Sequence, residues 1–391
     1  MKYYTTLRKN TKIEKGIAEN AITEKDLFNE DIDLNALLNA PPVKIEYRKN
    51  CIRMFTTTYE GSKSIEDIDI PTLNNFITFY EEQLKSLLKT EKIETKYTKF
   101  QIPKASGGLR TILAPDEDLK EIQSALKDIL EKQLKMLPHD TSYAYCRTRS
   151  VKNAVEVHQK HKSRWFLKLD LKDFFTYCSE ELIKEKIVKL YPICELPENI
   201  QERLVQLLCN AGLYENGLPQ GTPLSPVITN LIMMEFDVAV SKMLYKQGYT
   251  YTRYADDLII SARESFEYKP LIEEVDTILK DLNYPFQIKQ EKTRYGSSNG
   301  SNWNLGLMLN RDNQITIGHK NKKRIISMMY NLIKNPDKWS ASEGQVLLGH
   351  LNWYKANEPQ PFARTITWFN NKHNVDVMNI LMSVIKHSVI F

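Results

Sequence analysis

The stretch Tyr-Thr-Arg-Tyr-Ala-Asp-Asp-Leu-Ile-Ile-Ser, from Tyr251 to Ser261, places two adjacent carboxylates in a segment that otherwise has the composition of a β-strand. Repulsion between like charges and desolvation both disfavour such a pair. A hairpin turn is one explanation, since Asp suits turns, and a divalent cation is the other, since it makes paired carboxylates favourable. For Asp256 and Asp257 taken alone, an ordinary acidic turn is the preferred interpretation.

A third acid is relevant to the metal-ion explanation, although Asp170 alone could be an ordinary strand-end charge. Trp165-Phe-Leu-Lys-Leu-Asp-Leu predicts a strand that ends near Asp170. Neighbours on a straight strand point to opposite faces, so Asp256 and Asp257 approach one site only from a tight turn. A hairpin with these acids at its tip, beside the strand ending in Asp170, would hold two Mg²⁺ ions about 3.5–4 Å apart, as phosphoryl transfer requires. Mn²⁺ is the expected substitute ion.

The composition argues against a membrane protein, a secreted protein and a zinc-binding protein. The chain has 391 residues, 42% apolar and 26% charged, which suggests two or three domains. No apolar run approaches the roughly 18 residues of a membrane helix, and Met1–Asn10 is unlike a signal peptide, so a cytoplasmic protein is expected. The five cysteines have no zinc-type spacing. A net charge of +5 permits a polyanionic partner without demanding one.

The hydrophobic pattern predicts an α+β fold, with helices packed on a mostly antiparallel sheet. A β-hairpin is expected from Lys99–Lys104 and Leu109–Pro115, joined by a Ser-Gly-Gly turn. Helices are predicted over 75–88, 118–136, 180–190, 198–209, 226–245 and 268–282, short strands over 286–288 and 305–309, and helix after residue 318, with breaks at Pro336 and Pro359.

Several motifs follow one another in a recognisable order. They are Ile102-Pro-Lys-Ala-Ser-Gly-Gly-Leu-Arg-Thr-Ile, Leu169-Asp-Leu-Lys-Asp-Phe-Phe, Gly217-Leu-Pro-Gln-Gly-Thr-Pro-Leu-Ser-Pro, Tyr254-Ala-Asp-Asp, Gln290-Glu-Lys-Thr and Asn304-Leu-Gly-Leu. Together they resemble the reverse transcriptase family over about residues 99 to 310. Tyr-Ala-Asp-Asp alone would be a weak signal, whereas the ordered set is specific.

Within this family the chain looks most like the bacterial group of retron and related defence-associated enzymes. Gln220-Gly-Thr-Pro-Leu-Ser-Pro is similar to the retron and intron form, and Leu348-Gly-His-Leu-Asn-Trp-Tyr resembles a retron-type thumb segment. Asn153-Ala-Val-Glu-Val-His is near the retron Asn-Ala-x-x-His signature, with one additional residue. Asn304-Leu-Gly stands in place of the retron Val-Thr-Gly.

The resemblance implies a right-hand polymerase. The expected parts are a helical N-terminal extension over 1–90, fingers over 91–164, a palm over 165–302 with a fingers insertion at about 180–215, and primer grip and thumb over 303–391. The basic segment Lys320–Arg324 would then lie on the thumb, where it would contact duplex phosphates.

The resemblance also implies residue roles. Asp170 and Asp256 would be the main metal bridges, Asp257 the third carboxylate, and the Leu171 carbonyl an additional metal ligand. Phe175 would be the sugar gate that excludes a 2′-OH. The remaining nucleotide-binding residues would be Lys104 and Arg110 on the triphosphate, Gln220 and Gly221 at the incoming nucleotide, and Lys292 at the pyrophosphate.

The function that follows is RNA-directed DNA synthesis on a dedicated structured non-coding RNA, from dNTPs, in bacterial antiphage defence. The defence role rests on family analogy alone. An effector protein is left open as a partner, and so is the oligomeric state. Untemplated or protein-primed DNA synthesis is the first alternative. An RNA-binding scaffold with a vestigial polymerase site is the second, and the intact acids and fingers cations argue against it.

Overall fold

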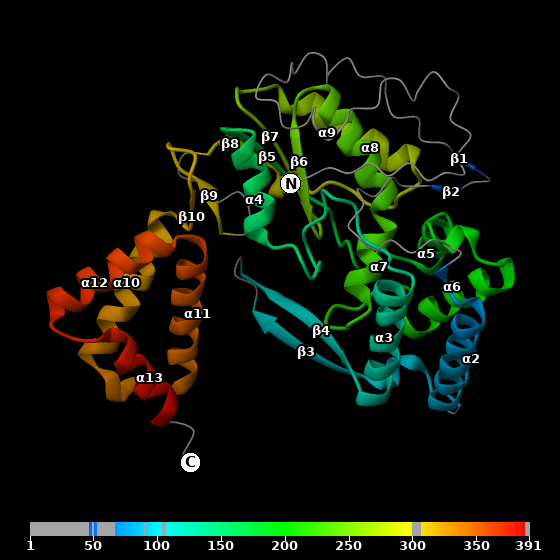
Figure 1. The fold of residues 1–391 in the computed structure, drawn as a ribbon, viewed down its shortest axis with the longest axis horizontal. Helices are drawn as coiled ribbons and strands as arrows, with labels where there is room; N and C mark the ends of the chain where they lie inside the picture. Colours follow the sequence, from blue (N-terminus) through cyan, green and yellow to red (C-terminus); the bar gives the residue numbers. More distant parts are fainter. Residues whose placement is uncertain are drawn as a thin grey trace. The chain divides into compact units, whose positions relative to one another are not determined.

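The computed structural model describes residues 47–48, 51–52, 67–89, 91–103, 107–298 and 306–387 (Figure 1). The chain divides into two compact units, each assembled from segments that are distant in the sequence. The first unit comprises 1–145, 171–247 and 274–287, and the second comprises 146–170, 248–273 and 288–391. Most of the expected N-terminal extension falls outside the described residues.

The first unit contains the predicted hairpin. Strands β3 (Tyr97–Pro103) and β4 (Leu109–Pro115) pair antiparallel along their full length. Helices α2, α3 and α6 contact one another, and α5 contacts α6 and α7. The helices of this unit are α2 (Ile70–Leu87), α3 (Glu117–Asp128), α5 (Glu180–Ile187), α6 (Glu198–Gly212), α7 (Ser225–Ile232) and α8 (Met234–Lys246).

Three predicted helices of this unit differ from the observed ones. The α-helix predicted over 118–136 ends at Asp128 and is followed by a π-helical turn over Ile129–Gln133. Helix α2 begins at Ile70 instead of residue 75, because Asp69 accepts a hydrogen bond from the Thr72 N–H (3.1 Å) and Pro71 lies in the first turn, where its missing N–H costs nothing. The helix predicted over 226–245 is broken at Met233 into α7 and α8. Nearly all of α7 is buried, so its apolar pattern does not locate the break.

The second unit contains an antiparallel sheet with the order β6-β7-β5-β8 (Figure 1). Its strands are β5 (Trp165–Asp170), β6 (Thr250–Tyr254), β7 (Asp257–Ala262) and β8 (Arg294–Ser297). The prediction of a mostly antiparallel sheet is confirmed. The segment predicted as a strand over 286–288 forms only a single β-bridge, at Ile288, and the strand β8 occurs a few residues later. Helix α9 (Tyr268–Asp281) follows β7.

Helix α4 (Val151–Lys160) contacts β6 and is fastened to the sheet by a buried histidine. In His158, Nδ1 lies 2.6 Å from the Ser261 hydroxyl and Nε2 lies 2.8 Å from the Thr252 hydroxyl. Ser261 donates its own proton to Ser163 (2.8 Å), so it accepts from His158 Nδ1–H, and Nε2 accepts from Thr252. Burial lowers the pKa of His158 to about 3, which keeps the ring neutral.

The C-terminal part of the second unit is helical, as predicted. After the short strands β9 (Met308–Leu309) and β10 (Ile315–Thr316) come α10 (Gly318–Lys334), α11 (Ala341–Asn357), α12 (Pro359–His373) and α13 (Val377–His387). One hydrophobic core joins these helices to the sheet, with Phe166 of β5 and Ile259 of β7 packed into the same cluster as Leu347 and Phe369. Among the described residues, no helix is long and apolar enough to cross a membrane.

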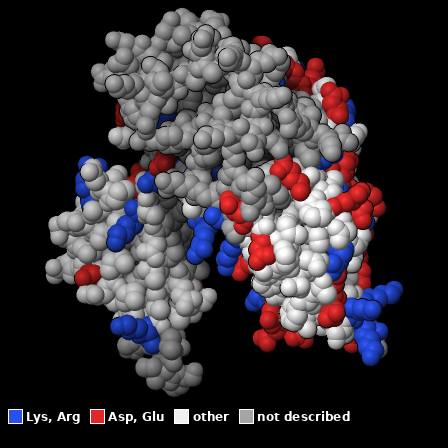
Figure 2. Space-filling view, turned by 45° about the vertical axis from the view of Figure 1, so that its right-hand side comes forward, with Lys and Arg blue, Asp and Glu red and all other residues white. Residues whose placement is uncertain are grey.

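A buried carboxylate holds the start of α10. Glu358, 6% exposed, accepts hydrogen bonds from the Thr316 hydroxyl (2.8 Å), the Ile317 N–H (2.9 Å) and the Lys322 ammonium (2.6 Å). Lys322 is thus committed to a structural ion pair, whereas Lys323 and Arg324 of the same basic segment are exposed. On the face drawn in Figure 2, described side chains of both charges are visible, separated by uncharged areas.

Candidate active site

The two adjacent acids lie at the tip of the β6–β7 hairpin. Tyr254 pairs with Asp257, which leaves Ala255 and Asp256 as a two-residue loop. Ala255 has a left-handed backbone (φ 56°), as the first loop position of such a turn requires. The fully buried Arg253 donates from its guanidinium to the Ala255 carbonyl (3.1 Å), which stabilises this conformation in a residue other than glycine.

The third acid lies directly across the sheet. Asp170 is the last residue of β5, is 5% exposed, and pairs in register with Asp257, the first residue of β7. Antiparallel partners have neighbouring side chains, so this register brings Asp170 and Asp257 to one edge of the sheet, next to Asp256. The predicted arrangement, a hairpin tip beside the end of a strand, is confirmed.

Three lysines surround these carboxylates. Lys168 forms an ion pair with Asp257 (2.5 Å), and Lys292 donates to both oxygens of Asp170 (3.1 and 2.9 Å). Lys292 belongs to the short helix Gln290–Lys292, and Lys289 Nζ lies 3.7 Å from Asp170. Lys292, which was predicted as a site residue, lies at Asp170 in the structure. Lys168 was not predicted as a site residue. Its signal was the spacing of Lys168 and Asp170, because residues two apart on a strand share a face.

The electrostatics of the site favour a cation. Burial raises the pKa of Asp256, and the charges of Asp257 and Asp170 raise it further. Burial likewise raises the pKa of Asp257, and Lys168 only partly opposes this effect. Burial lowers the pKa of Lys292, but Asp170, Asp256 and Asp257 together raise it by more, so Lys292 stays protonated. The lysines therefore leave part of the carboxylate repulsion uncompensated.

The donor chemistry fits Mg²⁺, which takes oxygen ligands and retains several waters. As the side chains lie here, no three His, Cys, Asp or Glu residues in the described part of the chain form a ready cluster around one point. Asp170 and Asp257 are instead turned toward their lysine partners. Because the backbone register already places these acids side by side, movement of side chains alone would present their oxygens to one ion.

The candidate nucleotide-binding residues of the first unit meet at β4. The Gln220 carbonyl accepts a hydrogen bond from the Leu113 N–H of this strand (2.8 Å). Gly221 has φ +113°, and a Cβ there would lie 2.6 Å from Ile112 Cγ2 and 3.1 Å from the Leu113 carbonyl oxygen. Glycine is thus required for the close approach of β4, the strand that carries the exposed Arg110.

Phe175 belongs to the same unit. Its carbonyl accepts from the Leu218 N–H (2.9 Å), which ties it to the loop that carries Gln220. The Phe175 ring is half-buried, whereas Leu171 is fully buried. Lys104 lies outside the described residues, so Arg110 is the one of the two predicted triphosphate-binding residues whose position is described. Asn304 also lies outside the described residues.

Comparison with known proteins identifies the family. Residues 102–329, more than half of the chain, match the family model for the reverse transcriptase (RNA-dependent DNA polymerase). The chain belongs to the reverse transcriptase family. It is an RNA-directed DNA polymerase with the right-hand polymerase fold, which combines helices with antiparallel sheets.

The curated relatives point to the bacterial retron-type group. The retron Ec73 reverse transcriptase of Escherichia coli is 28% identical over 288 residues, which cover 71% of this chain and 90% of that protein. The retron Ec86 reverse transcriptase of E. coli is 24% identical over 81% of this chain and 95% of its own. A telomerase structure from Candida albicans is similar over 80% of this chain and 65% of its own at 13% identity, with a TM-score of 0.42.

Proposed function

We propose that this reverse transcriptase copies a dedicated structured non-coding RNA into DNA in bacterial antiphage defence. The observation that carries its catalytic part is the pairing of Asp170 with Asp257 across β5 and β7, beside Asp256 in the hairpin loop. The similarity to retron enzymes over most of their length supports the RNA and defence parts by analogy.

In this proposal Asp170, Asp256 and Asp257 hold two Mg²⁺ ions, with the Leu171 carbonyl as an additional ligand. Bound there, the ions supply Lewis-acid stabilisation of the attacking and leaving oxygens. The reaction joins the primer 3′-oxygen to the α-phosphorus of a dNTP and breaks the bond to pyrophosphate. Lys292, kept protonated by Asp170, is the candidate proton donor to the pyrophosphate.

The proposal also assigns the residues that contact the nucleotide. Arg110, together with Lys104, would bind the triphosphate, because a guanidinium offers a planar fork of donors to phosphate oxygens. Gln220 and Gly221 would lie at the incoming nucleotide, where their loop is fixed to β4. Phe175 would exclude ribonucleotides by contact with a 2′-OH.

The test is primer extension on an RNA of defined sequence, with sequencing of the DNA product. Asp170→Asn and Asp257→Asn should each reduce synthesis by roughly a thousandfold, because each removes a charge that a divalent ion needs. Asp173→Asn is the matched control, since it changes an exposed carboxylate of the same motif, and it should stay within about twofold of the wild type. Full activity of the Asp170→Asn and Asp257→Asn enzymes would refute the assignment.

A further inference from the structure

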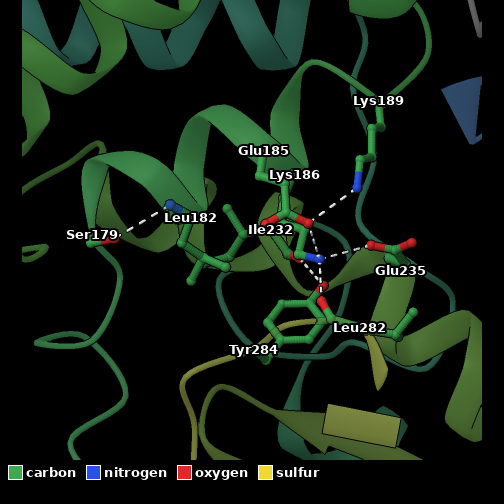
Figure 3. A network of polar contacts seen from close by, with 9 residues as sticks. All are labelled: Ser179, Leu182, Glu185, Lys186, Lys189, Ile232, Glu235, Leu282 and Tyr284. Atoms are coloured by element: carbon green, nitrogen blue, oxygen red, sulfur yellow. Dashed lines mark hydrogen bonds and ion pairs between the residues drawn. The ribbon is translucent and has the colours of Figure 1, made fainter. Parts of the chain in front are cut away.

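A lysine of helix α5 is buried in the first unit. Lys186 is 2% exposed, and its ammonium donates to Glu235 of α8 (3.0 Å), to the Leu282 carbonyl (2.5 Å) and to Glu185 (3.0 Å) (Figure 3). The same ammonium lies 4.3 Å from the centre of the Tyr284 ring. A buried charge needs such partners, so Lys186 fixes the position of the 282–284 segment against α5 and α8.

Tyr284 is held at both ends of its side chain. Its hydroxyl donates to the Ile232 carbonyl at 2.5 Å (Figure 3), and its ring stacks on Phe286 with the centroids 5.7 Å apart and the planes at 20°. Tyr284 is 6% exposed and Phe286 is 3% exposed. The Lys186 ammonium and the hydrogen bond hold the Tyr284 segment in the core, but the support that reaches Phe286 is the stacked ring itself, which a phenylalanine at position 284 would retain.

From Phe286 the ring contacts lead to the candidate sugar gate. Phe286 lies 5.0 Å from Phe174, and Phe174 meets Phe175 edge to face, with the centroids 5.6 Å apart and the planes at 83°. We call Tyr284, Phe286, Phe174 and Phe175 the aromatic row. Its inner three rings are buried, and its last ring is half-buried.

We propose that Phe286 and Tyr284 are positioning residues, which hold Phe175 in place through Phe174 and so set the preference for dNTPs over NTPs. This inference rests on the proposed role of Phe175 as the sugar gate. A steric gate discriminates only if its ring cannot yield when a 2′-OH presses on it. The aromatic row supplies this resistance, because closely packed rings have no free volume into which Phe174 can retreat.

The backbone supports the same arrangement. The Lys172 N–H donates to the Gln287 carbonyl (2.8 Å), which joins the segment that bears Phe286 to the segment that bears Phe174. The Phe175 carbonyl is held by the Leu218 N–H. The main chain of the gate is therefore fixed on two sides, so the freedom left to Phe175 is that of its side chain, which the row restricts.

The test measures kcat/KM for a dNTP and for the matching NTP in the full-length enzyme. Phe286→Leu removes the ring behind Phe174, and we expect the dNTP preference to fall by roughly fivefold while kcat/KM for the dNTP stays within about twofold. Phe286→Met, which conserves volume better, is the second variant if Phe286→Leu does not fold. Tyr284→Phe is the matched control, because it loses the bond to Ile232 and keeps the stack, so stability should fall with the preference unchanged.

Comparison with Phe175→Ala separates the possible outcomes. If Phe175→Ala lowers the dNTP preference and Phe286→Leu lowers it only when Phe175 is present, the inference is supported. If Phe175→Ala lowers it and neither Phe286 variant does, the inference is wrong and the gate assignment stands. If Phe175→Ala has no effect, both are wrong. Equal losses of preference in Tyr284→Phe and Phe286→Leu would indicate general loosening and overturn the inference.

Discussion

At the scale of single residues, Gly221 occupies a place that no side chain fits. We predict that Gly221→Ala lowers the free energy of unfolding by about 2–4 kcal/mol, since it combines left-handed strain with a clash against Ile112 and Leu113. The KM for dNTPs should rise, because β4 carries Arg110. Urea unfolding and steady-state kinetics measure the two effects.

Gly248 provides the control for this prediction. It also has a left-handed backbone (φ +77°), but a Cβ there would have open space around it. Gly248→Ala should therefore cost about 1 kcal/mol and leave the KM for dNTPs unchanged. Equal costs at the two positions would show that β4 yields to a side chain at residue 221.

The functional role of a residue could be predicted where the expected chemistry requires one residue type. The sequence indicated Asp170, Asp256 and Asp257 because they stand in motifs that follow one another in the order of the reverse transcriptase family, whereas each acid taken alone could be an ordinary turn or strand-end charge. It did not indicate Lys168 or the buried Arg253. A basic residue on a strand is expected to face solvent unless its partners on neighbouring strands are known. Pairing of distant strands supplies that information.

At the scale of elements, the attachment of α4 to the sheet should depend on pH. His158 has a pKa lowered to about 3 by burial, whereas the unfolded chain has an ordinary value near 6.5. The unfolded state therefore binds more protons, and stability is full above pH 6.5 and declines as the pH falls toward 3. We expect a loss of about 2 kcal/mol between pH 8 and pH 5 from this group.

Urea unfolding at these two pH values measures the effect. His158→Gln should be less stable at pH 8 but should lose less stability between pH 8 and pH 5 than the wild type. His319→Gln, at the exposed start of α10, should behave as the wild type does. An unchanged pH dependence in His158→Gln would mean that other groups cause the acid sensitivity.

Whether a segment is a helix or a strand could be predicted from the sequence more reliably than the residues at which it begins and ends. The hairpin β3–β4 and the strand β5 could be predicted because their residues have strand composition and turn residues mark where the strands end. The break at Met233 was missed because α7 is buried on nearly all sides, so its apolar pattern does not mark where it ends and α8 begins. The segment at 286–288 has strand composition, but Phe286 packs against Tyr284 and Phe174 as part of the aromatic row.

At the scale of the whole molecule, Mg²⁺ should stabilise the folded protein. Ions that bind the native carboxylates and not the unfolded chain add roughly 2.7 kcal/mol at a concentration one hundred times the Kd. Thermal unfolding with EDTA and with Mg²⁺ measures this, and the increase should disappear in Asp170→Asn. An equal increase in that variant would place the stabilising ion elsewhere.

The overall fold could be predicted from the ordered motifs, which indicate a right-hand polymerase. What the sequence does not contain is which distant segments share a core. Phe166 and Ile259 of the sheet pack into one cluster with Leu347 and Phe369 of the C-terminal helices, and no local pattern marks this association. The identity of the template lies outside the fold altogether, because the catalytic groups act on phosphates and sugars common to every sequence.

The most direct measurement sequences the nucleic acid that copurifies with the protein from its native operon, for the wild type and for the double variant Asp256→Ala/Asp257→Ala. We predict a defined RNA in both samples, and DNA complementary to part of that RNA in the wild type alone. DNA without a complement in the bound RNA, or RNA alone in both samples, would contradict templated reverse transcription of a dedicated RNA.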